Sequence, residues 1–286
     1  MFHVEPNKPS HIIAEPIDHL VSKRTFQIIW DEQSQIAITS PFPSEETLSS
    51  YYDSDDYISH GNPNKTISDF LYRLVQIFMF SRKRKWLAKY LVTEKTVLDY
   101  GCGTGSFVTY LLKKQISSFG IEPNEKARSL SESKKNIFPS FKDVDKTSFD
   151  VITLWHVLEH IPDQKNIFTQ LISRFHNKST LIIALPNLQS FDCQYYKSYW
   201  AGFDVPRHLW HYSPQGIAQF ATSFGLKLVE TKAMWFDSLY VSYLSEKQSG
   251  AFFPLVRGIF VGMYSNLKAI RSKNYSSIVY VFQKES

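Results

Sequence analysis

Residues 97–105 constrain the fold of this chain more than any other stretch. An apolar strand with Asp99 near its end is followed by glycines at positions 101, 103 and 105. Apolar residues at helical spacing follow in residues 106–114, which predicts a helix directly after the turn. Because glycine has no Cβ, a strand–turn–helix of this kind lets backbone N–H groups approach a ligand closely. The stretch therefore predicts a nucleotide-type cofactor site.

The spacing of the glycines separates two classes of cofactor. The dinucleotide fingerprint is G-x-G-x-x-G, whereas this chain has G-x-G-x-G and places Ser106 where the third dinucleotide glycine would stand. Asp99 at the strand end disfavours a diphosphate and suits a cationic, amine-bearing ligand. The pattern resembles motif I, D-x-G-x-G-x-G, of the class I S-adenosylmethionine (SAM)-dependent methyltransferases. A nicotinamide-dependent oxidoreductase shares the fold and stays open as the weaker alternative.

The unit of strand, turn and helix recurs downstream. An apolar run ends at Glu122, about 20 positions after the glycines, and residues 149–155 and 181–185 are two further buried strands. Ligands of open parallel sheets bind at the carboxyl ends of the strands, where an acidic side chain can accept hydrogen bonds from a ribose. The residues that we expect to contact the cofactor are Asp99, Gly101, Cys102, Gly103, Gly105, Glu122, Pro123, Asp143 and Trp155.

The resemblance assigns roles within that set. It implies that Asp99 recognises the methionine end of SAM, that Glu122 binds the ribose, and that Asp143 holds the adenine amino group. The segment F-D-V-I-T-L-W-H-V-L-E-H-I-P-D at residues 149–163 is similar to the corresponding segment of methyltransferases that act on small molecules.

A competing pattern lies in the same segment. His156, Glu159 and His160 match H-x-x-E-H, the inverted zinc-protease signature. That chemistry needs both histidines on one long helix, but Pro162 follows two residues later and the pattern starts at a strand end. We therefore expect no metal. Histidine has a reference pKa near 6.5 and takes a proton at neutral pH, so His156 is the first candidate for a catalytic base.

An aromatic insertion at residues 191–212 is the expected substrate element. Rings with a few cations suit a sugar or another planar acceptor with an anionic group, and the substrate candidates are Tyr196, Trp200 and Arg207. His208 and His211 are further candidate bases. The string W-x-G-x-D-x-P-R-H at residues 200–208 resembles a segment of bacterial small-molecule methyltransferases. The open alternative is that the aromatic rings only pack a lid or a dimer surface.

The whole pattern predicts an α/β fold: a doubly wound, mostly parallel, seven-stranded, Rossmann-like sheet with an N-terminal extension and aromatic-rich insertions. Asn124, Asp163 and Ser213 are expected helix N-caps, residues 25–30 and 35–39 a hairpin, and residues 277–283 a final antiparallel strand. We expect an extension at residues 1–60, a helical connector or lid at 61–95, and a methyltransferase domain at 96–286. Its insertions are 191–212 and 236–273. The extension resembles a degenerate zinc-ribbon module that has lost its cysteines and binds no metal.

Composition limits the partners. The formal net charge is +5, and the one dense basic run, residues 82–85, is the kind usually found on a solvated helical face. The [DN]-P-P-[YFW] tetrad of DNA amino-methyltransferases is absent, so we expect no nucleic-acid partner. Two cysteines, no signal peptide and an interrupted apolar stretch at residues 251–263 indicate a cytoplasmic protein without a membrane span. The sequence leaves the oligomeric state open.

The predicted reaction is transfer of a methyl group from SAM to a small-molecule acceptor. A sugar or a cell-envelope glycan precursor is the preferred acceptor. A non-catalytic SAM-binding interaction protein is the alternative from another class, because one module of the chain has diverged.

Overall fold

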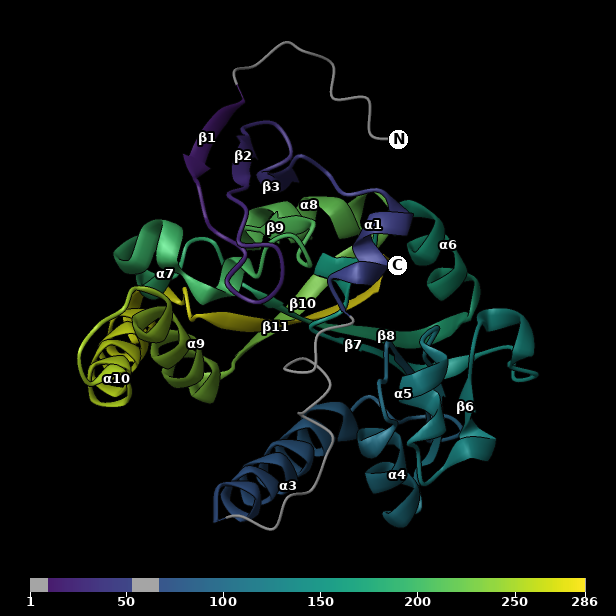
Figure 1. The fold of residues 1–286 in the computed structure, drawn as a ribbon. Helices are drawn as coiled ribbons and strands as arrows, with labels where there is room; N and C mark the ends of the chain where they lie inside the picture. The colour runs from purple at the N-terminus through teal and green to yellow at the C-terminus, as the bar shows by residue number, and fades with distance from the viewer. Residues whose placement is uncertain (1–9, 53–66, 286) are drawn as a thin grey trace.

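The protein is described by a computed structural model that covers residues 10–52 and 67–285. Its larger sheet has the order β10-β11-β8-β7-β4-β5-β6 (Figure 1). The strands are β4 (Thr96–Tyr100), β5 (Ser117–Ile121), β6 (Ile137–Phe138), β7 (Phe149–Trp155), β8 (Phe175–Pro186), β10 (Leu226–Ala233) and β11 (Ser277–Lys284). Strands β6, β5, β4, β7 and β8 pair in parallel, and β11 is antiparallel to both of its neighbours. The predicted seven-stranded, mostly parallel sheet is confirmed.

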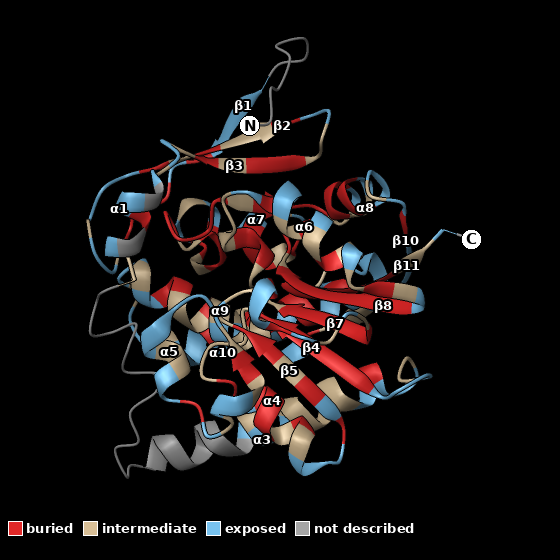
Figure 2. Cartoon of the chain, turned by 90° about the vertical axis from the view of Figure 1, so that its right-hand side faces the viewer, coloured by how far each residue is buried: buried red, intermediate tan, exposed pale blue. Residues whose placement is uncertain are grey.

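Both faces of this sheet are buried, as Figure 2 shows for the central strands. Successive residues of β4 enter different clusters: Leu98 packs with α6 (Gln164–Ser173) and α8 (Pro214–Thr222), and Val97 with α3 (Ile67–Ala88) and α4 (Ser106–Lys113). Alternating side chains of a strand point to opposite faces, so helices on both faces explain why these strands are continuously apolar. The core is therefore doubly wound, as predicted.

The predicted N-caps are confirmed. The side chain of Asn124 accepts a hydrogen bond from the backbone N–H of Ala127 at the start of α5 (Glu125–Ser129). Asp163 and Ser213 cap α6 and α8 in the same way. Such caps satisfy backbone donors that the first helical turn leaves free. Short 3-10 turns lie at Lys134–Asn136, Phe141–Asp143, Leu158–His160, Lys197–Tyr199 and Ala201–Phe203.

A second sheet has the order β1-β2-β3-β9. It contains β1 (His11–Ala14), β2 (Gln27–Asp31), β3 (Ile36–Ser40) and β9 (Trp210–Tyr212), and α1 (Glu45–Ser50) follows β3. The predicted hairpin is confirmed as β2–β3, with Ile29 opposite Ile38. Strand β9 belongs to the aromatic insertion, which also contains α7 (Phe191–Tyr196). The described part of the extension thus shares its sheet with a segment about 170 residues downstream.

A helical hairpin separates the last two strands of the larger sheet. Helices α9 (Trp235–Gln248) and α10 (Pro254–Ser272) lie together at one end of the molecule (Figure 1). A Cβ built at Gly258 would lie 2.5 Å from the Cα of Tyr243, and one at Gly262 would lie 2.7 Å from the carbonyl oxygen of Ser238. The two backbones therefore approach so closely that only glycine fits. Within the described ranges, no helix has the length and apolarity needed to cross a membrane.

Candidate active site

The glycine turn lies between β4 and α4. Its three glycines have φ angles of +71° (Gly101), +56° (Gly103) and +69° (Gly105), a region that side-chain-bearing residues rarely adopt. A Cβ at Gly101 would lie 2.5 Å from the Val157 side chain, and one at Gly105 would lie 2.7 Å from Ile137. A Cβ at Gly103 would meet no described atom within 4 Å. Gly101 and Gly105 are therefore needed for packing, whereas Gly103 opens onto free space.

Glu122 holds this turn in place. Its Oε2 accepts a hydrogen bond from the backbone N–H of Gly103 at 2.9 Å, and its Oε1 accepts one from the N–H of Asn124 at 2.9 Å. Each carboxylate oxygen keeps a second acceptor position. Glu122 therefore links the ends of β4 and β5 and can still accept hydrogen bonds from a ligand that lies over Gly103.

Asp99 is a buried carboxylate at the end of β4. It is 3% exposed, and its Oδ1 accepts a hydrogen bond from the Thr153 hydroxyl at 2.6 Å. Burial raises the pKa of Asp99 to about 6, although the hydrogen bond from Thr153 and the positive charge of Lys83 both act to lower it. A buried carboxylate with a raised pKa is stabilised by an incoming cation.

Lys83 is a site residue that the sequence analysis missed. The basic run at residues 82–85 was expected to be solvated, but Lys83 of α3 places its Nζ 4.3 Å from the centroid of the Trp155 ring. Burial lowers the pKa of Lys83 to about 8, against the attraction of Asp99 and Asp237. The expectation of a solvated face is wrong here because α3 packs against α4, and this packing turns Lys83 toward the end of β4.

Trp155 ends β7 beside this lysine. Its ring packs edge-on against Phe107 with centroids 6.0 Å apart. Its indole Nε1 is buried and has no hydrogen-bond partner in the described parts of the chain. A buried donor without a partner costs free energy, so the unpaired N–H is a second feature of the site that suits a bound ligand. Together with the open space at Gly103, it supports the expected cofactor position.

The other predicted cofactor residues lie at the margin. Cys102 is half-buried within the turn, and its sulfur would lie 2.5 Å from a Cβ at Gly120. Pro123 is exposed. Asp143 is exposed and accepts a hydrogen bond from the Ser140 hydroxyl at 2.7 Å. None of these contacts points to a ligand role, and the roles stay predictions.

His156 follows β7 at the same sheet edge, with a φ of +56°. Its Nε2 lies 3.1 Å from Asp237 of α9, and its Nδ1 lies 3.5 Å from Glu159. Burial disfavours the charged ring, but the carboxylates of Asp237 and Glu159 outweigh it and raise the pKa of His156 to about 9. A base at neutral pH has to be unprotonated, so this environment favours the protonated, hydrogen-bond-donating form of the ring. The catalytic role of His156 stays a prediction.

The structure places His208 and His211 differently. His208 is 9% exposed and lies against His160, with ring centroids 4.5 Å apart. The Nε2 of His211 lies 2.9 Å from the Thr39 hydroxyl of β3, inside the second sheet. Burial lowers the pKa of His211 well below its usual value. His208 thus joins the loop after β7, whereas His211 is engaged with the extension.

The three predicted substrate residues are packed inside the protein. Trp200 is 2% exposed and donates its indole N–H to Asp192 at 2.8 Å. Tyr196 donates its hydroxyl to Glu246 at 3.1 Å. Arg207 is 1% exposed and pairs with Asp204 at 2.6 Å and with Asp18 at 3.4 Å. These contacts connect the insertion to the extension and to α9, as expected if the insertion has a packing role. They give no support to the predicted substrate roles, which stay predictions.

Comparison with known proteins agrees with this geometry. The family model described as "Methyltransferase domain" matches residues 75–231, more than half of the chain. No curated protein sequence matches. The fold is similar to that of magnesium protoporphyrin IX methyltransferase from Synechocystis PCC 6803 with bound SAH. That comparison has a TM-score of 0.54 and 13% identity, over 85% of this chain and 100% of the other.

A second similar structure is the plantazolicin methyltransferase BpumL in complex with a pentazolic desmethylPZN analog and SAH. It has a TM-score of 0.52 and 15% identity, over 84% of this chain and 95% of the other. At such identities the likeness shows the fold, and SAM is the cofactor of this methyltransferase fold. The chain belongs to the methyltransferase-domain family and has the class I, SAM-dependent architecture.

Proposed function

We propose that this protein transfers a methyl group from SAM to a small-molecule acceptor at the carboxyl edge of the larger sheet. The observation that carries the proposal is the open space at Gly103, where a Cβ would meet no described atom, beside two carboxylates that retain acceptor positions. When bound, SAM supplies a methyl group on a positively charged sulfur.

Each charged residue of the site binds a different group of the cofactor. Asp99 accepts hydrogen bonds from the ammonium group of the methionine end, and Lys83 faces its carboxylate. Glu122 accepts from the ribose hydroxyls while it holds the N–H of Gly103. Positioning contributes much of the rate of a methyl displacement, so these residues act chiefly by orientation. His156 and Asp237 lie beyond Trp155 and orient the acceptor.

The acceptor class rests on resemblance. Residues 149–163 and 200–208 resemble segments of bacterial small-molecule methyltransferases, and the extension resembles a module found on some sugar methyltransferases. We propose a sugar or a cell-envelope glycan precursor. In this proposal the acceptor contacts His156 and its neighbours. The structural role then belongs to the buried residues Tyr196, Trp200 and Arg207.

The domain division is part of the proposal. Residues 61–95 act as a connector whose helix α3 closes the cofactor site with Lys83. Residues 1–60 are a metal-free relic of a zinc-ribbon module, although a fraction of this segment, residues 1–9 and 53–60, lies outside the described residues. The hairpin β2–β3 and the absence of cysteine from residues 1–60 support this interpretation.

Calorimetric titration of the purified protein with SAM, S-adenosylhomocysteine and NADH tests the function. Micromolar binding of SAM or its product is expected, and NADH binding without SAM binding would overturn the proposal. A screen of glycan precursors follows, in which His156→Ala should lower turnover while SAM affinity stays within a few-fold. Tight SAM binding without methylation of any acceptor would favour the non-catalytic alternative.

A further inference from the structure

Three side chains, of which Glu159 and His208 are buried and His160 is half-buried, form a cluster at the turn after β7. Glu159, His160 and His208 each place one ligand atom so that all three atoms lie within 4.8 Å of one another. Glu159 and His160 belong to the turn after β7, and His208 comes from the aromatic insertion. Val157 of the same turn is the residue that a Cβ at Gly101 would strike. The turn that carries Glu159 and His160 therefore packs against the glycine turn through Val157.

Hydrogen bonds define which nitrogen of each ring is free. Nδ1 of His160 lies 3.0 Å from the carbonyl oxygen of Arg207, and Nδ1 of His208 lies 2.9 Å from the carbonyl oxygen of Gly202. A carbonyl can only accept, so Nδ1 of His208 carries the proton and its Nε2 keeps a lone pair. Nδ1 of His160 also lies 3.0 Å from the Tyr52 hydroxyl, which can donate or accept; when this Nδ1 donates to the Arg207 carbonyl, Nε2 of His160 keeps a lone pair as well. Histidines that bind metals are commonly oriented by this N–H to carbonyl bond.

Glu159 supplies the charge of the cluster. Its side chain is 1% exposed, and neither carboxylate oxygen has a hydrogen-bond partner among the described residues. The nearest cationic group is Nδ1 of His156, at 3.5 Å. A buried carboxylate without hydrogen bonds is costly unless a cation compensates it. The protonated His156 ring compensates part of the charge of Glu159, but both carboxylate oxygens still lack a hydrogen bond from any described residue, which suits a metal ligand.

We propose that Glu159, His160 and His208 bind a divalent first-row transition-metal ion such as Zn²⁺ or Mn²⁺. Two imidazoles and one carboxylate are a donor set that such ions accept, and Mg²⁺ prefers oxygen ligands alone. Three protein donors leave coordination positions for water or a substrate oxygen. The expectation of no metal was based on the lack of a long helix. Here a short turn supplies two donors, and the insertion brings the third.

Metal binding can be measured without cofactor or acceptor. Full-length protein stripped with a chelator is titrated with Zn²⁺ by calorimetry and with Co²⁺ by visible absorption. We expect one ion per chain and a Co²⁺ band typical of four or five nitrogen and oxygen donors. Glu159→Gln and His208→Ala should each weaken binding at least about 100-fold. His211→Gln is the matched control, because His211 is also buried in the insertion but bonds Thr39.

The outcomes separate this proposal from the proposed function. Stripped wild-type protein that binds SAM but takes up neither ion would overturn the metal site alone, as would binding that His208→Ala leaves unchanged. Metal binding without SAM binding would instead contradict the cofactor assignment and leave the metal site standing. The Zn²⁺ and Co²⁺ titrations of the wild-type protein need no variant, so the test can be made even if a variant fails to fold.

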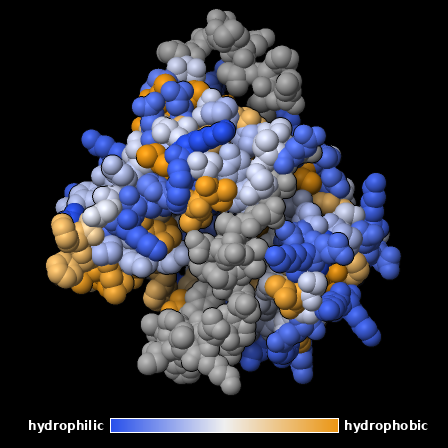
Figure 3. All heavy atoms as spheres, in the orientation of Figure 1, coloured by the Kyte–Doolittle hydropathy of each residue, from blue (hydrophilic) through white to orange (hydrophobic). Residues whose placement is uncertain are grey.

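A different observation concerns the outer face of α10. Its large apolar residues point to solvent and continue into the loop before it, with Phe252 88%, Phe253 78% and Phe260 69% exposed. Figure 3 shows apolar atoms gathered over α9 and α10. The side of α10 that packs on α9 carries Gly258, Gly262 and other small residues. Small residues inside and large apolar residues outside reverse the usual pattern of a water-soluble helix.

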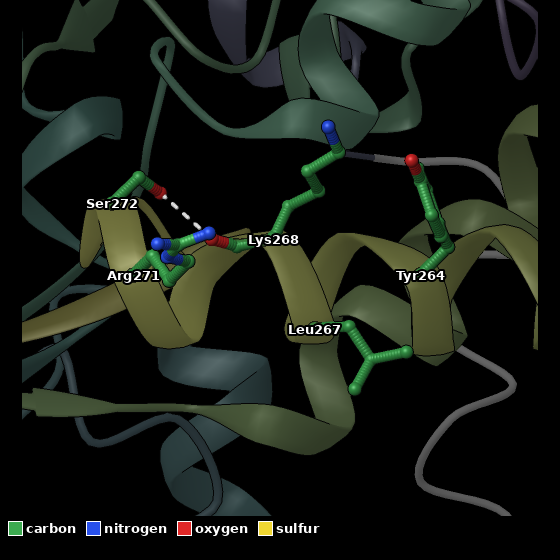
Figure 4. Close-up of a pocket in the computed structure, with 5 residues that line it drawn as sticks. All are labelled: Tyr264, Leu267, Lys268, Arg271 and Ser272. Carbon is green, nitrogen blue, oxygen red and sulfur yellow. Dashed lines mark hydrogen bonds between the residues drawn. The ribbon is translucent and has the colours of Figure 1, made fainter.

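Basic residues predominate around this face, although Arg257 is paired with the buried Glu246 of α9 at 2.8 Å. Residues 247–284 contain six lysines and arginines and no aspartate or glutamate. A hollow of about 530 Å³ on α10 is lined by Tyr264, Leu267, Lys268, Arg271 and Ser272 (Figure 4). Cations beside exposed aromatic and aliphatic side chains complement the phosphates and acyl chains of an anionic membrane surface. We infer that α10 and the preceding Phe252–Phe253 tip dock on an anionic lipid bilayer, lying in its interface.

Vesicle sedimentation tests this inference. The full chain should bind vesicles that contain phosphatidylglycerol at least about tenfold better than pure phosphatidylcholine vesicles. Phe252→Ser with Phe253→Ser, and separately Lys268→Glu with Arg271→Glu, should each remove most of that binding. Ile12→Ser is the control, since Ile12 is an exposed apolar residue (50%) on β1. Equal or absent binding to both vesicles would overturn it, as would a stable dimer that the phenylalanine variant dissociates.

Discussion

The glycine turn and the aromatic insertion are both rich in polar and aromatic residues, but they use them in opposite ways. The turn keeps acceptor positions and one open Cβ position, at Gly103, free toward a ligand. In the insertion, by contrast, the polar side chains bind other residues of the protein: Arg207, Trp200 and Tyr196 each pair with a carboxylate of the same chain. A residue type suited to binding is thus not evidence of a binding site until its partners are known.

The comparison also explains which motif predicts function well. The glycine turn acts through its backbone, so its spacing alone specifies where the N–H groups lie. The insertion acts through side chains, whose direction depends on what packs against them. The described extension supplies this packing, with Asp18 and Thr39 reaching Arg207, His208 and His211.

The largest expected effect is a loss of stability, and it tests whether Arg207 of the insertion has a structural role. Arg207→Met leaves Asp18 and Asp204 without their buried partner, and loss of one member of such a pair typically costs about 3–5 kcal/mol. Urea unfolding should show this loss while SAM affinity stays within a few-fold. Arg24→Met, at an exposed position, is the control. Unchanged stability with a raised KM for the acceptor would restore the predicted substrate role.

A second substitution tests the turn. Gly103→Arg fills the open space over the turn and should weaken SAM binding at least about 100-fold, or about 2.7 kcal/mol. Gly225→Arg is a matched control, because Gly225 also has a positive φ (+72°) and also meets no described atom within 4 Å. Both variants carry the same backbone strain, so calorimetry isolates the ligand contact. Equal affinities in the two variants would show that the space at Gly103 is not the cofactor site.

Glu122 has features of both regions, because it accepts hydrogen bonds from the backbone and is also proposed to bind the cofactor. Glu122→Gln keeps one acceptor oxygen but loses the charge and one of the two backbone hydrogen bonds. SAM affinity should fall about tenfold, which is about 1.4 kcal/mol, with a small change in melting temperature. A large fall in melting temperature with unchanged affinity would assign Glu122 to structure, like the residues of the insertion.

The smallest effect is a pH dependence of cofactor binding. With a pKa of about 6 in the free protein, Asp99 is ionised at pH 7.5 and mostly protonated at pH 5.5. Since the ammonium group of SAM binds the ionised form, affinity should fall about fourfold between these pH values and stay flat from 7.5 down to about 6.5. Calorimetry across this range checks the slope, and Asp99→Asn should remove it. A slope that survives in Asp99→Asn would point to another group.

The local elements were predictable from the sequence by itself. Strand periodicity, the N-caps Asn124, Asp163 and Ser213, the hairpin β2–β3 and the glycine turn depend on residues a few positions apart. Each could be recognised without knowing the rest of the chain. The seven-stranded sheet followed from their order, because strand–helix units that recur build a doubly wound sheet.

The tertiary structure alone decided which side chains meet. Lys83 reaches Trp155 across 72 positions of the sequence, and His208 reaches His160 across 48. Strand β9 pairs with β3 from about 170 positions farther along the chain. Such contacts depend on helix packing and strand pairing between distant segments, and no local pattern encodes them. The sequence therefore determined the glycine turn, while long-range packing decided that Tyr196, Trp200 and Arg207 of the insertion are buried and that Glu159, His160 and His208 come together.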